Sequence, residues 1–184
     1  NKYKKNIKIG ALGVGHHDKG THLLYELASR LDKLNIKKNY ELHLIGHITD
    51  SRLRENIPDN IIIHSLDQPL SLDEYREKIK EMDFTLFCYE FDTYKLRASG
   101  TFLDSLSYVK PIIATKTSYF EHYFKIMGDI GYLCDDLKKV EETIIKLLEN
   151  IDENRYIQQQ KNILNGRNLF SVENVGKQIK EIIR

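Results

Sequence analysis

The stretch "LRASGTFLDSLSYVKPIIAT", from Leu96 to Thr115, joins a turn of small residues, a helix and an apolar run. Ser99 and Gly100 open the helix, Asp104 lies one turn inside it, and Pro111 begins the apolar run. Proline cannot continue a helix, and a continuous apolar run is typical of a strand covered on both faces. Because helix N-termini hold anions and small residues let a ligand approach the backbone, this stretch predicts a ligand site beside a buried strand.

The rest of the chain alternates short apolar runs with longer amphipathic ones, which predicts an α/β fold. We expect a single Rossmann-like three-layer domain over residues 1–184, with a parallel sheet and helices on both faces. A capping-box pattern at Ser71 and Glu74 predicts the start of one helix, and Ser171 is a cap candidate for the last one. Strands are expected at 7–12, 40–46, 61–65, 84–89, 111–115 and 131–134, and helices from 21, at 72–82, 99–108 and 135–151, followed by two more.

Ligands bind beyond the carboxyl ends of the strands in such sheets, so the loops 13–20, 65–70, 90–98 and 115–120 are candidates for the site. The first of these loops, "GVGHHDKGT", does not have the glycine spacing of a dinucleotide fingerprint. It does not match a P-loop either, because Lys19 precedes Gly20 and Thr21 follows it directly. Two interpretations stay open from the residues alone: a cradle for a phosphate or diphosphate, and a tight turn with a solvated lysine.

Composition excludes several other classes of function. The 184 residues carry 28 Lys and Arg against 27 Asp and Glu, so no global basic field attracts nucleic acid. No apolar run approaches the length of a membrane span. Two cysteines without a CxxC motif indicate a reducing compartment and no disulfide, and we expect a cytoplasmic protein. The cluster His16, His17, Asp18 and His22 matches no standard zinc spacing, so no metal is expected.

These motifs together resemble the C-terminal, donor-binding domain of GT-B-fold glycosyltransferases, especially the retaining family-four type. The likeness covers nearly the whole chain, through "GALGVGHHDKGTHLL", "YELHLIG", "FLDSLSYVKPIIAT", "FEHYF" and "GYLC". Its most specific part is the Pro-Ile-Ile-Ala-Thr ending, seven residues after an acid. The resemblance implies a hexosyltransferase whose donor is a UDP- or GDP-linked sugar, with no cofactor, acting in polysaccharide or glycoconjugate biosynthesis.

The resemblance also implies roles for individual residues. Lys19 would neutralise the donor diphosphate, the turn at Ser99 would offer backbone N–H groups to it, and Asp104 would accept hydrogen bonds from ribose hydroxyls. Ser65 and Leu66 would border the base. The complete set of expected donor-binding residues is Gly13, Gly15, His16, Lys19, Ser65, Leu66, Ser99, Gly100, Thr101 and Asp104.

Two positions depart from the family pattern, which usually has two glutamates eight positions apart. The second position holds the shorter Asp104, and the first holds Leu96, which is not acidic. The catalytic residues are therefore unknown, and Glu90 and Asp92 are the weak candidates that could replace the missing acid.

The resemblance implies a separate N-terminal acceptor-binding domain, which is absent from this chain, so the isolated domain is expected to be inactive. We expect peripheral association of the full-length protein with the inner face of a membrane. Two alternatives stay open: a non-catalytic nucleotide-binding or partner-recognition module, which Leu96 favours, and one half of a sugar-nucleotide epimerase.

Overall fold

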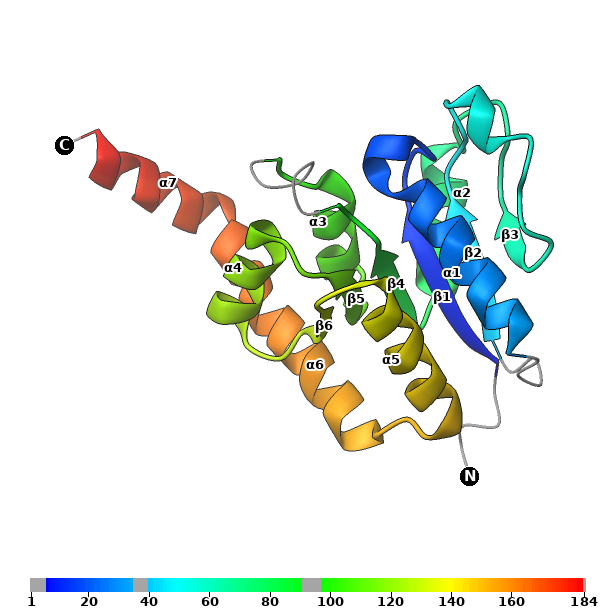
Figure 1. Cartoon of the computed structure of the whole chain (residues 1–184). Helices are drawn as coiled ribbons and strands as arrows, with labels where there is room; N and C mark the ends of the chain where they lie inside the picture. The colour runs from blue at the N-terminus through cyan, green and yellow to red at the C-terminus, as the bar shows by residue number, and fades with distance from the viewer. Residues whose placement is uncertain (1–5, 35–39, 91–96, 184) are drawn as a thin grey trace.

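The computed structural model, which describes residues 6–34, 40–90 and 97–183, contains one parallel sheet (Figure 1). The strand order is β3-β2-β1-β4-β5-β6, and every neighbouring pair runs parallel. This confirms the predicted α/β fold with a single sheet. The strands are β1 (Ile7–Leu12), β2 (Tyr40–Ile45), β3 (Ile61–Ile63), β4 (Phe84–Phe87), β5 (Ile112–Thr115) and β6 (Gly131–Cys134).

Helices cover both faces of the sheet, as predicted. Helices α1 and α5 pack on one face, and α2, α3, α4 and α6 pack on the other. Ser71 and Glu74 form the expected capping box, and Ser171 caps the last helix. Helix α4 was not among the predicted helices. The helices are α1 (Thr21–Lys33), α2 (Leu72–Glu81), α3 (Gly100–Ser107), α4 (Ser118–Met127), α5 (Leu137–Glu149), α6 (Glu153–Gly166) and α7 (Val172–Ile182).

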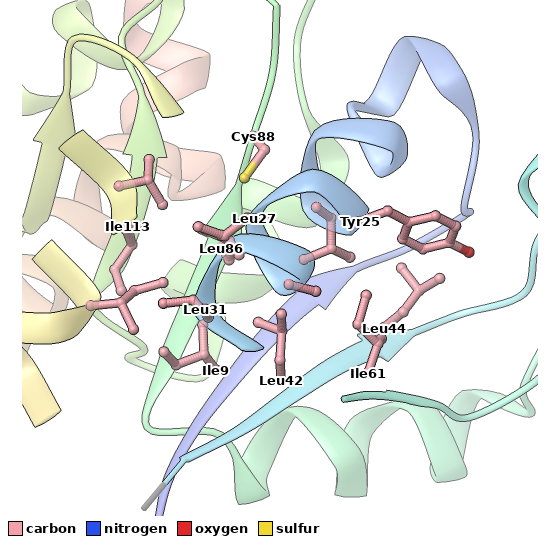
Figure 2. Packing of buried hydrophobic residues seen from close by; sticks show 14 of the residues in the cluster. Ile9, Tyr25, Leu27, Leu31, Leu42, Leu44, Ile61, Leu86, Cys88 and Ile113 are labelled. Carbon is pink, nitrogen blue, oxygen red and sulfur yellow. The ribbon is translucent and has the colours of Figure 1, made fainter. Parts of the chain in front are cut away.

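The largest core cluster fixes α1 against the middle of the sheet (Figure 2). Leu27 and Leu31 point from α1 onto Ile9, Leu42 and Leu86, and all five side chains are almost completely buried. Burying an aliphatic side chain of this size contributes about 1.5–3 kcal/mol. The packing therefore holds the start of α1, and the loop before it, at a fixed place above the carboxyl ends of β1 and β4.

The last helix, α7, extends away from the sheet (Figure 1). None of its residues is buried, and Val172 and Ile182 are 91% and 83% exposed. No helix within the described residues is both long and apolar enough to cross a membrane.

Candidate functional site

The carboxyl ends of β1 and β4 define the place where a ligand can enter the sheet. The chain leaves β1 toward α1 on one face and leaves β4 toward α3 on the other, so the strand order reverses here. Open α/β sheets bind ligands in the crevice at this topological switch point. A small cavity of about 20 Å³ lies at this place, and its lining includes Val14, Lys19, Gly20 and Tyr89.

Backbone hydrogen bonds join the loops after β1, β2 and β3 into one rim. The N–H of Gly13 donates to the carbonyl of the last residue of β2 at 2.8 Å, and the N–H of Gly15 donates to the carbonyl of His47 at 2.7 Å. The N–H of Ile48 then donates to the carbonyl of Leu66 at 3.1 Å. The structure therefore brings Gly13 and Gly15 of the first loop close to Leu66 of the loop after β3, through the segment that follows β2.

The end of the first loop is held tightly against β4. His16 begins a 3-10 helix over His17–Lys19, because its Nδ1 accepts the backbone N–H two residues further on at 3.2 Å. Gly20 ends that helix with φ +70°. A Cβ atom at Gly20 would lie 1.7 Å from the carbonyl oxygen of Cys88, so only glycine fits. This contact places Lys19 beside the end of β4.

The first turn of α3 carries a small network of hydroxyl groups. Ser99 is the N-cap of α3, and its Oγ accepts the backbone N–H of Phe102 at 3.2 Å. The same Oγ lies 3.0 Å from the Tyr89 hydroxyl and 3.1 Å from that of Thr101. Gly100 is exposed, and no atom lies within 4 Å of the place where its Cβ would be. The turn is therefore fixed by Ser99 and open to a ligand at Gly100.

The first loop and α3 touch each other. A Cβ atom at Gly13 would lie 2.8 Å from Cγ2 of Thr101. Gly13 has φ +93°, where side chains other than that of glycine are strained. The absence of a side chain at Gly13 thus lets the backbone of the rim approach the helix turn that the resemblance implicates in diphosphate binding.

Asp104 forms a hydrogen bond that the sequence did not predict. The hydroxyl of Tyr75, in the first turn of α2, donates to Oδ2 of Asp104 at 2.9 Å. Burial and the negative charge of Asp104 raise the pKa of the Tyr75 hydroxyl well above its ordinary value, so it stays protonated. The capping box at Ser71 was the available signal, because it located the first turn of α2 in the sequence. It did not indicate that Tyr75 faces α3.

Glu90, one of the two acidic candidates, lies in the loop after β4 and contacts a histidine. Oε1 of Glu90 lies 3.2 Å from Nε2 of His22 on α1, and the His22 ring stacks on His17 at a centroid distance of 3.7 Å. Glu90 is 44% exposed at its side chain. Asp92 and Leu96 lie outside the described residues.

Ser65 and Leu66, which were predicted to border the base, lie in the loop after β3. The Ser65 hydroxyl donates to the carbonyl of Gln68 within its own loop, and the Leu66 side chain is 46% exposed. The hydroxyl of Ser65 therefore stabilises the loop, while Leu66 presents an exposed apolar side chain at the rim.

The two thiols are not candidates for a nucleophile. Cys88 and Cys134 are free and buried. Burial raises the pKa of Cys88 to about 12, so the reactive thiolate is not populated near neutral pH. Within the described residues, no group of three or more His, Cys, Asp and Glu side chains is arranged to hold a metal ion.

Comparison with known proteins identifies the fold. No family model matches the sequence, and no curated protein matches it. Among solved structures, a TarM variant from S. aureus in complex with fondaparinux, α-GlcNAc-glycerol and UDP is 14% identical, with a TM-score of 0.71 over 96% of this chain. The C-terminal domain of the group 1 glycosyltransferase LpcC from Francisella tularensis is 16% identical, with a TM-score of 0.63. The match covers 93% of this chain and 90% of that domain.

A third neighbour is the catalytic domain of cholesterol-α-glucosyltransferase from Helicobacter pylori, 14% identical, with a TM-score of 0.64. That match covers 89% of this chain and 99% of the other. These neighbours are GT-B glycosyltransferases, and the chain has the fold of their C-terminal domain, which confirms the resemblance at the level of fold. The chain covers 35% of the length of TarM.

Proposed function

We propose that the chain binds a nucleoside-diphosphate sugar, UDP- or GDP-linked, as the donor domain of a glycosyltransferase. The observation that carries the proposal is that Lys19 and the N-terminal turn of α3 both lie near Tyr89 at the switch point. Tyr89 lines the same cavity as Lys19, and its hydroxyl lies 3.0 Å from Ser99 Oγ and 3.4 Å from Thr101 Oγ1. A lysine side chain and the N-terminal turn of α3 thus flank the end of β4.

This arrangement suits a diphosphate for electrostatic reasons. The N-terminus of a helix carries a partial positive charge and presents N–H donors, and Lys19 adds a full positive charge. Fixed donors of this kind stabilise the negative charge that develops on the leaving nucleoside diphosphate when the glycosidic bond breaks. Asp104 would then accept hydrogen bonds from the ribose, and Ser65 and Leu66 would border the base.

Transfer itself requires more than this chain in our proposal. A polysaccharide or glycoconjugate acceptor would bind to a separate N-terminal domain, and the isolated chain would bind the donor without transferring a hexosyl group. The full-length protein would act in the cytoplasm, at the inner face of a membrane.

Calorimetric titration of the chain with UDP, GDP, ADP and CMP tests the proposal. We expect one nucleoside diphosphate to bind, and Lys19→Ala to weaken it about tenfold or more, because a hydrogen bond to a charged group is worth roughly 1.5–3 kcal/mol. Lys33→Ala is the matched control, since Lys33 is an exposed lysine at the far end of α1. Failure of every nucleotide to bind, or equal affinity in Lys19→Ala and the wild type, would contradict the proposal.

A further inference from the structure

The contact between Tyr75 and Asp104 joins two helices at the carboxyl edge of the sheet. Tyr75 comes from the first turn of α2, and Asp104 comes from the second turn of α3. Their side chains meet at 2.9 Å although they are 29 residues apart. One turn before Asp104, Thr101 contacts the backbone of Gly13. The pair therefore lies next to the turn where we propose that the diphosphate binds.

The Tyr75 ring is held in place before any ligand arrives. The N–H of Tyr75 donates to the carbonyl of Ser71 at 2.9 Å, and the Ser71–Glu74 capping box fixes this first turn. The ring packs, partly buried, on a cluster that contains Leu12 and Ile45 from the ends of β1 and β2. A hydroxyl fixed by packing loses little conformational entropy when a ligand binds to it.

The pair is rich in hydrogen-bond acceptors. The phenol proton is donated to Oδ2, so Oδ1 of Asp104 and a lone pair on the Tyr75 oxygen are left to accept hydrogen bonds. None of the ion pairs in the described part of the chain involves Asp104. Both side chains are partly exposed. Two adjacent acceptors at one accessible place are suited to a ligand that presents two neighbouring hydroxyl donors.

We infer that Tyr75 is a specificity-determining residue, and that its hydroxyl and Asp104 together bind the vicinal 2′ and 3′ hydroxyls of the donor ribose. This inference rests on the proposed function and deepens it. One ribose hydroxyl donates to Oδ1 of Asp104, and the other donates to the Tyr75 oxygen. The consequence is selection of ribonucleotides over deoxynucleotides, because a nucleotide lacking one hydroxyl leaves an acceptor of the pair without its partner.

Titration of the chain with UDP, 2′-deoxy-UDP and 3′-deoxy-UDP, and with the corresponding guanosine diphosphates, tests the inference. We expect the wild type to prefer the ribonucleotide about tenfold over each deoxy form. Tyr75→Phe is expected to weaken ribonucleotide binding by about three- to tenfold and to remove the preference over one of the two deoxy forms. Tyr108→Phe is the matched control, because Tyr108 packs in the same cluster and contacts Asp104 through its backbone N–H.

The possible outcomes separate this inference from the proposed function. Equal binding of ribonucleotide and deoxynucleotides by the wild type overturns the inference and leaves the donor site standing. An equal loss of affinity for the ribonucleotide and both deoxy forms in Tyr75→Phe also overturns it, because that pattern shows a merely structural role. If no nucleoside diphosphate binds, both the proposed function and the inference fail. Thermal unfolding of each variant shows whether a loss of affinity reflects a loss of folded protein.

Discussion

Replacing Gly20 by alanine should destabilise the protein and displace the first loop. Gly20 has φ +70°, and an L-residue in that conformation costs roughly 1–2 kcal/mol. The new Cβ would also lie 1.7 Å from the carbonyl oxygen of Cys88, so the loop and the end of β4 would have to move apart by more than 1 Å. We expect these two effects together to lower the free energy of unfolding by about 3 kcal/mol, within the range of the more severe single substitutions.

Thermal unfolding followed by circular dichroism measures this effect. A loss of this size lowers the Tm of a chain of this length by roughly 6–12 °C. Gly176→Ala is the matched control, because no atom lies within 4 Å of the Cβ position there and the residue is inside α7, where alanine is favoured. A Tm for Gly20→Ala within about 1 °C of the wild type would refute the reasoning that the loop is fixed against β4.

Three other predictions follow from burial. Burial lowers the pKa of both His43 and His64 from 6.5, so below that pH the unfolded chain binds more protons than the folded chain. The free energy of unfolding should therefore be fully retained above about pH 6.5 and should fall toward pH 5. Thermal melts of His64→Gln should show a weaker dependence of Tm on pH than the wild type. A thiol reagent should react with Cys88 and Cys134 only after denaturation, because both are buried; rapid modification of the native chain at neutral pH would contradict this. Deletion of the residues after Phe170 should change the Tm by less than about 3 °C, because α7 buries none of its residues, and a larger loss would show that α7 supports the core.

Local signals in the sequence were enough to predict most of the elements. The apolar runs gave β1 and β6 with the bounds that the structure has, and the Ser71–Glu74 pattern gave the start of α2. The fourth strand was predicted two residues too long. Cys88 and Tyr89 are buried but lie beyond the ladder, and the Thr115 hydroxyl donates to the Tyr89 carbonyl at 2.6 Å in place of a strand partner. Burial alone therefore does not show where strand pairing stops.

Helix α4 and the strand order were not predicted, for different reasons. The segment "SYFEHYFKIM" is rich in aromatic residues, which favour strands, but Thr117 caps it as a helix and Phe120 buries its ring against Phe102. Tertiary packing thus overrides the local preference. The strand order depends on contacts between distant segments, which no local pattern specifies.

The candidate site shows the same division between local and distant signals. The turn at the first loop and the start of α3 at Ser99 were predictable, because the positive φ of Gly13 and Gly20 and the Ser99 cap are local features of the chain. The contacts between Gly13 and Thr101, and between Tyr75 and Asp104, were not predictable, because each depends on how two separate elements are placed on the sheet. Whether the ten expected donor-binding residues bind a nucleotide stays a prediction.

The Tyr75–Asp104 contact also gives the departure at position 104 a physical meaning. An aspartate reaches less far than the glutamate that is usual in the family, so alone it would have a smaller reach toward a ribose above α3. The fixed hydroxyl of Tyr75, 2.9 Å from the carboxylate, extends the acceptor surface by one oxygen without adding a charge. In the proposed site, the shorter acid and the tyrosine therefore act as one unit.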